Sequence, residues 1–349
     1  MTGLPIKIAL AGVGNCASVF VQGLRFYSGD EHKGLWHPNI AGFKAKDVEV
    51  VAAFDVDSGK VGLELSKAVF APPNVARRYL PLPKSKVVVE PGISRSDAAP
   101  HLIGARLERS SSDEVSKKLG AAEADILINL ISSGSNASSE EYARAALKAR
   151  CAFINCTPSL VLKNNKLVAD FQRAKLPLIG DDLMSQFGGT VFHKGLLNLL
   201  VKRGVKISKS YQLDVGGGSE TENTINEEIK MAKRGVKTAS VATEVPYKFE
   251  TIAGTTDFVD YMGNDRTSYF WFEGSSFLDS GISVDVYLRS SDGANAGNVL
   301  LDVVRATYRS MKVGRLGTVG EICAYGFKAP PRPAPFEEAY TKFAALYVR

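Results

Sequence analysis

Apolar runs alternate with helical patterns along the first half of the chain. An apolar run over residues 6–11 passes through a glycine turn into a helical pattern over 17–27, and a second apolar run at 48–54 follows a polar insert. Continuous apolar runs are typical of strands covered on both faces, as in a parallel sheet. Further strands are expected at 86–89, 125–131, 152–156 and 177–179, and further helices at 57–70, 139–150, 166–175 and 190–203. This order predicts an α/β fold with a doubly wound parallel sheet.

The pattern changes after the last of these helices. Segments at 209–215, 247–252, 267–273 and 281–289 are rich in β-branched and aromatic residues, and no helical pattern separates the last three. They predict an antiparallel or mixed sheet in a second domain. An amphipathic pattern over 298–311 predicts a helix that packs back on the first domain. The 349 residues suit two domains, at roughly 100 to 200 residues each.

A proline-rich segment interrupts the alternation in the first half. Residues 71–112 contain six prolines and many charged side chains. A structureless segment of this length is uncommon inside a compact domain, so we expect it to be functional or to lie at an interface.

Composition and charge narrow the possible partners. The 43 basic and 37 acidic side chains give a net charge of +6, which is spread along the chain and so favours anionic metabolites rather than nucleic acid. No apolar stretch of membrane-spanning length and no leader pattern occur, so a cytoplasmic protein without membrane association is expected. The four cysteines and four histidines lack metal-ligand spacing, so no bound metal is expected.

The glycine turn after the first strand predicts a dinucleotide site. Residues 12–17 read G-x-G-x-x-A, which allows a tight turn, close backbone approach to a pyrophosphate and a helix N-terminus behind it. The second strand ends at Asp55, 43 positions after Gly12 rather than about 20, and the polar insert at 29–46 accounts for the excess. Asp55 has no arginine directly after it, which favours NAD over NADP. The expected cofactor-binding residues here are Gly12, Gly14, Asn15, Cys16, Ala17 and Asp55.

A second loop follows the strand at 125–131 and contains Ser132 and Ser133. Loops at the carboxyl ends of strands line the ligand crevice of a doubly wound sheet, so both serines are cofactor-binding candidates. The alternative is a purely structural loop in which Ser139 is the N-cap of the next helix.

Five segments together carry a family resemblance. GVGNCAS, FDVDSGKVGLELSKAVFA, PLIGDDLMSQFGG, LDVGGGSETEN and AYGFKAPP, in this order, resemble the inositol-1-phosphate synthases (inositol-3-phosphate synthases), closest to their archaeal and actinobacterial branch. The resemblance covers nearly the whole chain. It implies an NAD-binding Rossmann domain over 1–195 and 296–349, and an inserted α+β, mainly β-sheet catalytic and tetramerisation domain over 196–295. A homotetramer is therefore expected.

The same resemblance implies a reaction. In that family, NAD oxidises C5 of D-glucose 6-phosphate, the ketone acidifies C6, an intramolecular aldol reaction closes the ring and the hydride is returned. The product is 1L-myo-inositol 1-phosphate, a precursor in inositol and phospholipid biosynthesis, and there is no net redox change. The resemblance leaves open a weakly bound divalent or monovalent cation. Such chemistry needs cations both for the phosphate and for the developing negative charge.

The resemblance also implies the residues that supply these cations. Lys233 and Lys328 are expected to stabilise oxyanions and relay protons, while Lys237 and Arg266 hold the phosphate. Arg266 stands where relatives carry lysine, and it preserves charge but cannot shuttle a proton near neutral pH. From the pattern alone, Lys230, Lys233 and Lys237 would ordinarily form a solvated helix face, and Lys328 would cap a strand or face solvent; only the resemblance favours the site.

The GDD segment and its surroundings complete the expected site. Asp181 and Asp182 are cofactor candidates, with Asp182 near the nicotinamide or ribose, although the pair could also be a turn or N-cap. Two departures, Met184 in place of lysine and Gly218 in place of asparagine, remove polar groups from the expected crevice. The substrate-binding residues implied are Ser185, Gln186, Gly188, Gly189, Thr190 and Asn223.

Three other functions remain open from the sequence. Met184, Gly218 and Arg266 leave room for a relative that cyclises another phosphosugar. An NAD-dependent dehydrogenase with net hydride transfer would share the nucleotide site. A non-catalytic NAD-binding assembly protein would not need the lysines.

Overall fold

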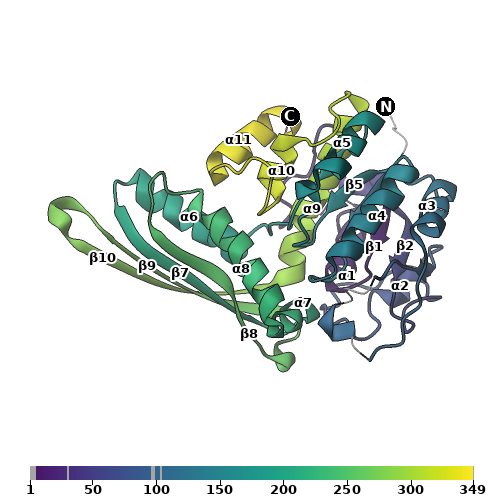
Figure 1. Cartoon of the computed structure of the whole chain (residues 1–349), viewed down its shortest axis with the longest axis horizontal. Helices are drawn as coiled ribbons and strands as arrows, with labels where there is room; N and C mark the ends of the chain where they lie inside the picture. Colours follow the sequence, from purple (N-terminus) through teal and green to yellow (C-terminus); the bar gives the residue numbers. More distant parts are fainter. Residues whose placement is uncertain (1–4, 30, 96–98, 103, 349) are drawn as a thin grey trace.

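The computed structural model describes residues 5–29, 31–95, 99–102 and 104–348. One half of the molecule is built on a six-stranded parallel sheet, on the right in Figure 1. Its strand order is β3-β2-β1-β4-β5-β6, so successive strands are added on one side of β1 up to β3 and on the other side from β4 onward. The doubly wound α/β fold expected from the sequence is therefore confirmed. The strands are β1 (Ile6–Ala11), β2 (Val48–Asp55), β3 (Val89–Pro91), β4 (Ile126–Asn129), β5 (Ala152–Asn155) and β6 (Leu178–Ile179).

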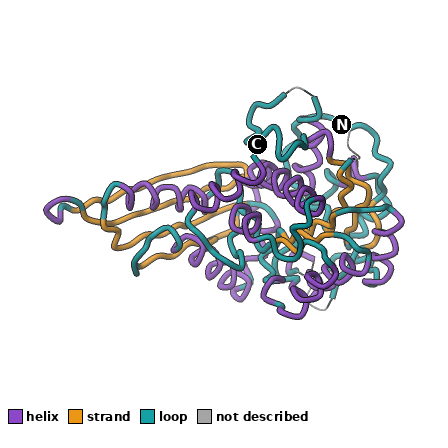
Figure 2. The backbone as a smooth tube through the Cα atoms, turned by 90° about the horizontal axis from the view of Figure 1, so that it is seen from above, coloured by secondary structure: helices purple, strands orange, loops and turns teal. Residues whose placement is uncertain are grey.

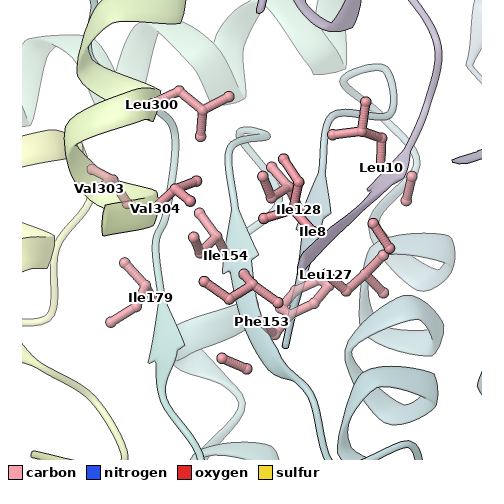
Figure 3. Packing of buried hydrophobic residues seen from close by; sticks show 14 of the residues in the cluster. Ile8, Leu10, Leu127, Ile128, Phe153, Ile154, Ile179, Leu300, Val303 and Val304 are labelled. Atoms are coloured by element: carbon pink, nitrogen blue, oxygen red, sulfur yellow. The ribbon is translucent and has the colours of Figure 1, made fainter. Parts of the chain in front are cut away.

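A continuous apolar core surrounds this sheet. Helix α9 (Asp292–Lys312) lies against it, and its Leu300 and Val304 lie close to Ile154 of β5 (Figure 3). The late helix therefore packs back on the first half of the chain, as its apolar pattern predicts. The other helices of this part are α1 (Asn15–Phe26), α2 (Leu65–Ala68), α3 (Ser112–Ala121), α4 (Asn136–Lys148), α5 (Asn165–Ala174), α10 (Gly320–Gly326) and α11 (Phe336–Tyr347).

A second, four-stranded sheet has the order β10-β9-β7-β8. It is mixed, because β7 and β8 are parallel while β9 runs antiparallel to β7 and to β10. Its strands are β7 (Lys206–Gly216), β8 (Glu250–Phe258), β9 (Asp265–Ser275) and β10 (Gly281–Ser291), and its helices are α6 (Gly189–Lys202), α7 (Ser219–Glu222) and α8 (Glu227–Ala242).

The mixed sheet has one covered and one open face. Helices α6 and α8 lie along one face, over a core that includes Phe270 and Phe272 (Figure 1). Among the described residues no helix covers the opposite face, where Tyr211 and Trp271 stack with ring centroids 5.4 Å apart and Tyr287 is 67% exposed. The long strands extend away from the parallel part of the molecule (Figure 2).

Local differences from the expected elements have local causes. The helix expected at 57–70 is reduced to the single turn of α2, because Gly62 adopts a φ of 83° that a helix interior does not allow. Helix α3 was not expected from the apolar pattern, although Ser111 and Glu114 form a capping box at its start. Helix α4 begins at Asn136, so Ser139 is not its N-cap and instead donates to the Ser135 carbonyl. In the described part of the chain no helix is both long and apolar enough to cross a membrane.

Candidate active site

A cavity of about 200 Å³ lies where the two sheets meet. Its lining comes from the glycine turn, the loop after β4, the GDD segment, β7, α8, the start of α9 and Lys328. A cavity of about 300 Å³ next to α1 is larger but mainly apolar and lacks these charges. Of the residues expected from the sequence, the smaller cavity brings together Gly14, Asn15, Cys16, Ser132, Asp182, Ser185, Gly189, Thr190, Lys233, Lys237, Arg266 and Lys328.

One wall of the cavity is made by the glycine turn. Gly12 has a φ of 91°, and a Cβ there would lie 2.8 Å from the backbone of Leu130. Gly14 is the N-cap of α1, whose first turn carries no acidic residue. The free N–H groups and positive dipole end of α1 therefore face the cavity, an arrangement that fits a pyrophosphate.

Asp55 lies behind this wall and outside the cavity lining. One oxygen of its carboxylate accepts a hydrogen bond from the Val13 amide at 2.7 Å, and the other accepts from the amides of Val56 and Asp57. Its side chain is 11% exposed. These bonds hold the glycine turn in place, while contact with a ribose remains a prediction. Gly12 and Ala17 also lie outside the lining.

The proline-rich segment supports the same turn. Asn15 accepts hydrogen bonds from the backbone amides of Val75 and Ala76, at 2.7 and 2.9 Å. Asn74 donates to the Val13 carbonyl at 2.9 Å, as does the buried Lys60 at 3.1 Å. Part of the segment expected to be functional or interfacial thus braces the cofactor candidate Asn15.

The opposite wall carries four cations, each paired with a carboxylate. The cations are those expected from the sequence, whereas three of the four carboxylates, Asp214, Glu220 and Asp292, were missed. Two of them lie in the LDVGGGSETEN segment, so their position was a signal that could have been used. The pairs are Lys233–Glu220 at 2.7 Å, Lys237–Asp214 at 2.6 Å, Arg266–Asp292 at 2.8 Å and Lys328–Asp182 at 2.7 Å.

Asp214 is the most deeply held of these carboxylates, with 1% of its side chain exposed. Besides Lys237, it accepts hydrogen bonds from Ser268 at 2.6 Å and from the Gln212 amide at 2.9 Å. Burial alone would raise the pKa of Asp214, but the charges of Lys237 and Arg266 outweigh it and hold the pKa well below its ordinary value. Asp214 is therefore a fixed anion.

The environment of Lys237 shows that the four cations lie close together at the cavity. Its side chain is 5% exposed, and burial lowers its pKa. Asp214 partly opposes this shift, while the charges of the other three cations, Arg266, Lys328 and Lys233, add to it. Positions up to 95 residues apart in the sequence, from 233 to 328, thus act on one ammonium group.

Arg266 behaves differently from Lys237. Burial would lower its pKa, but the carboxylates of Asp292 and Asp214 and more distant acidic groups raise it above the ordinary value. Its guanidinium also lies 3.5 Å from the Thr221 hydroxyl. Arg266 is therefore a permanent charge on the cavity wall.

The two aspartates of the GDD segment have separate environments. Asp181 is 1% exposed and accepts hydrogen bonds from the Asn155 side chain at 2.7 Å and from the Leu162 amide at 2.9 Å. Burial raises its pKa to about 7 despite these donors. Asp182 lines the cavity and pairs with Lys328, so only the second aspartate is positioned to meet a ligand.

The expected phosphate cradle is only partly assembled at the cavity. Ser185, Gly189 and Thr190 line it, with Gly188 as the N-cap of α6 just behind. Gln186 points elsewhere, because its side-chain oxygen accepts a hydrogen bond from Asn298 at 2.6 Å and the residue lines the larger apolar cavity.

Three further residues named from the sequence also lie off the cavity. Ser133 is buried, and its amide donates to Glu220 at 3.2 Å. Asn223 is fully buried behind Ser132 and contacts His101. Met184 is buried with its amide donating to Gly326, so it removes no polar group from the lining, in contrast to Gly218, which does line it.

No group of three or more metal-ligating side chains gathers among the described residues. The described residues of the site supply four paired cations, a helix N-terminus and backbone amides. These features suit a dinucleotide together with a phosphorylated, anionic reactant.

Comparisons with known proteins point the same way. A family model described as Myo-inositol-1-phosphate synthase matches residues 188–293. The inositol-3-phosphate synthase of Corynebacterium glutamicum is 30% identical over 362 residues, covering 100% of this chain and 99% of the relative. That of Mycolicibacterium smegmatis is 33% identical over 340 residues, covering 94% and 93%.

A solved structure extends the likeness to three dimensions. The crystal structure of Ari2 has a TM-score of 0.79 to this chain at 30% sequence identity, covering 98% of this chain and 99% of Ari2. The family resemblance drawn from the five sequence segments is thereby confirmed, together with the enzyme class, an isomerase of the inositol-3-phosphate synthase type. The chain belongs to the myo-inositol-1-phosphate synthase family.

Proposed function

We propose that this enzyme converts D-glucose 6-phosphate to 1L-myo-inositol 1-phosphate with bound NAD and no net redox change. The observation that carries the proposal is the convergence of Lys233, Lys237, Arg266 and Lys328 on one cavity beside a dinucleotide-type glycine turn. The proposed reaction develops negative charge on a sugar that already carries a phosphate. A wall of four cations stabilises both charges.

The residues present fit NAD. Gly14 lines the cavity and has no atom within 4 Å of an added Cβ, and the start of α1 has no side-chain cap, so the backbone there is open to the close approach that a pyrophosphate needs. We propose that Gly14, Asn15 and Cys16 hold the diphosphate, and that Ser132 and Asp182 lie at the nicotinamide end. When bound, NAD would accept a hydride from the sugar and later return it.

The cations divide between two tasks in this proposal. Arg266 is a permanent charge and is assigned to the phosphate, together with Ser185, Gly189 and Thr190. Lys233 and Lys328 stabilise oxygen atoms that gain negative charge. Lys237, which also lines the cavity, is assigned to the phosphate with Arg266, as the family resemblance implies.

A second candidate substrate is another hexose phosphate, and Gly218 favours it. A Cβ at Gly218 would lie 3.6 Å from Asn15 and Asn264, so the cavity has space where relatives carry a side chain. The Nδ2 atom of Asn264 is buried with no hydrogen-bond partner among the described residues. A substrate of different shape could use this space and this donor.

The domain division and the assembly remain proposals. We propose an NAD-binding domain over 1–195 and 296–349 and a catalytic and tetramerisation domain over 196–295. The open aromatic face of the mixed sheet, around Tyr211, Trp271 and Tyr287, supports its use as a subunit interface in a homotetramer. A cytoplasmic location and a weakly bound cation remain predictions from the sequence.

The deciding experiment is product analysis. The purified enzyme is incubated with NAD and either glucose 6-phosphate or fructose 6-phosphate, with and without divalent and monovalent cations, and the sugar phosphates are separated. We expect an inositol phosphate from glucose 6-phosphate and no accumulated NADH. A carbocycle formed only from fructose 6-phosphate would favour the second candidate, and accumulated NADH would indicate a dehydrogenase. Absence of any cyclic product would refute the proposal.

A pair of lysine variants tests the site. Lys328→Ala should lower turnover about 100- to 1000-fold, the usual loss when one donor to a developing oxyanion is removed. Lys230→Ala is the matched control. Lys230 lies on the same helix as Lys233, α8, but outside the cavity lining, and its ammonium is 3.7 Å from the Glu227 carboxylate. Full turnover of Lys328→Ala would contradict the assignment of the charged wall.

A further inference from the structure

Behind the cavity, three side chains form a continuous hydrogen-bonded line. Ser132 lines the cavity, and its hydroxyl lies 3.3 Å from the Nε2 atom of His101. The Nδ1 atom of the same ring lies 3.0 Å from the Oδ1 atom of Asn223, which is fully buried. His101 lies on a 3₁₀ turn, Pro100–Leu102, and Asn223 begins another, Asn223–Ile225. The sequence analysis gave His101 no role.

The direction of each hydrogen bond between these side chains follows from a hydrogen bond made by the His101 backbone amide. The His101 amide also meets the Oδ1 atom of Asn223, at 3.2 Å. A backbone N–H can only donate, so the atom of Asn223 that faces it is the oxygen, and flipping the side-chain amide would set donor against donor. The ring Nδ1, facing the same oxygen, therefore carries a hydrogen.

This bond fixes the other end of the imidazole as well. In the neutral ring only one nitrogen carries a hydrogen, so Nε2 is an acceptor and the Ser132 hydroxyl donates to it. The hydroxyl hydrogen of Ser132 is then engaged behind the cavity. Its oxygen keeps two lone pairs, so Ser132 faces a ligand as a hydrogen-bond acceptor.

The position of Ser132 indicates which ligand group it meets. The loop begins next to the glycine turn, where Leu130 donates to the Ala11 carbonyl and Gly12 packs against the Leu130 backbone. It thus flanks the point between β1 and β4 where the strand order reverses, over which a dinucleotide crosses a doubly wound sheet. The carboxamide of nicotinamide offers an N–H donor at that end.

We propose that His101 is a positioning residue that, through Asn223 and Ser132, fixes an acceptor for the nicotinamide carboxamide N–H. The inference rests on the NAD site of the proposed function. It assigns His101 a role, and it gives the buried Asn223 a task other than substrate binding. The effect is one of orientation: His101 does not touch the ligand.

Paired variants separate this role from a purely structural one. His101→Gln keeps an oxygen able to accept from Ser132 but loses the link to Asn223, whereas His101→Asn keeps a donor for Asn223 but loses the acceptor. Ser132→Ala removes the acceptor in the cavity, and His32→Asn, at an exposed histidine elsewhere, is the control. Thermal unfolding establishes that each variant is folded.

The readout is calorimetric binding of NAD and of 3-acetylpyridine adenine dinucleotide, in which a methyl group replaces the carboxamide nitrogen. We expect the wild type and His32→Asn to bind NAD about three- to tenfold more tightly than the analogue, the range expected for one neutral hydrogen bond. This preference should fall by about that factor in Ser132→Ala and His101→Asn and persist in His101→Gln. The double variant His101→Asn/Ser132→Ala should show no further loss, because both changes remove the same interaction.

Each result bears on a different claim. An unchanged preference in Ser132→Ala or His101→Asn, its loss in His101→Gln, or no preference in the wild type would overturn the role of His101. If His101→Asn does not fold, Ser132→Ala and His101→Gln still decide the question. If the wild type did not bind NAD at all, the result would instead contradict the NAD dependence of the proposed function.

Discussion

The two walls of the cavity are built from different materials. The glycine-turn wall consists of backbone amides, small side chains and the start of α1, and its shape follows from Gly12 and the bonds of Asp55. The charged wall consists of long basic side chains from α8, β9 and the segment after α10, each held by a carboxylate. The first is fixed by backbone geometry and the second by ion pairs between side chains.

This difference decides where each wall is vulnerable. A backbone-built wall fails when a side chain occupies space or when a strained turn relaxes. A wall of buried charges fails when one member of a pair is removed, because the remaining charge has lost both water and its partner. The predictions below probe the charged wall first, then its support, then the glycine turn.

The largest effect is expected at Asp214. Asp214→Asn leaves the buried Lys237 without its anion, and removal of one partner of a buried pair costs about 3–5 kcal/mol. We expect a loss of that size in the free energy of unfolding, measured by urea denaturation, together with loss of turnover. Asp113→Asn is the control, because Asp113 pairs with Lys148 on the surface and its loss should have little effect. Equal losses in the two variants would mean that the charged wall does not depend on its buried pair.

The next effect concerns His193, which lies behind the charged wall and contacts it through Gln212. It is fully buried, and it contacts Gln212, which in turn donates to Asp214. Burial lowers the pKa of His193 to about 4, so the native state takes up its proton only below that pH, whereas the unfolded state takes it up near 6.5. The stability that this residue contributes is therefore complete above pH 6.5 and is lost as pH falls toward 4, by up to about 3 kcal/mol.

The measurement is the difference in unfolding free energy between the wild type and His193→Gln across this pH range. Asp181 has a raised pKa and acts with the opposite sign between about pH 4 and 7, but it is present in both proteins and cancels in the difference. A difference that stays constant with pH would show that the native state binds a proton at His193 as readily as the unfolded chain does.

The smallest effect is expected at the glycine turn. Gly12→Ala places a Cβ 2.8 Å from the Leu130 backbone at a φ of 91°, and we expect a loss of roughly 1–3 kcal/mol with weaker NAD binding. Gly42→Ala is a matched control, because Gly42 has a φ of 94° but no atom within 4 Å of the added Cβ. The extra loss of unfolding free energy in Gly12→Ala over Gly42→Ala measures the cost of the contact with the Leu130 backbone. Equal losses in the two variants would mean that only the positive φ matters at Gly12.

The glycine-turn wall was largely predictable from the sequence because its main residues form one recognisable motif. The bounds of β1, the turn after it and Asp55 at the end of β2 lie within one βαβ unit. Local reading failed where a glycine broke a helical pattern, as at Gly62 in the expected helix 57–70. It also misjudged Ser139, because the helix begins three residues earlier than its polar pattern indicates.

The charged wall was predictable only in part. The family resemblance named its cations but did not give their partners. Asp182 and Lys328, for example, are 146 positions apart and meet only in the folded chain. The same limit applies to His101, whose neighbour Asn223 is 122 positions away. No periodicity or spacing encodes contacts of this range. Asp214 and Glu220 lie only 23 and 13 positions from their lysines, but nearness in sequence does not say which acidic side chain pairs with which cation.

The pairing of every cation on the charged wall has a consequence for how a reactant arrives. Each pair is nearly a dipole, and its field fades within a Debye length of about 8 Å at physiological ionic strength. The wall therefore does little to draw an anion from a distance. A phosphate that reaches it by diffusion shares each cation with a resident carboxylate, so the fit of the sugar, in addition to its charge, decides what stays.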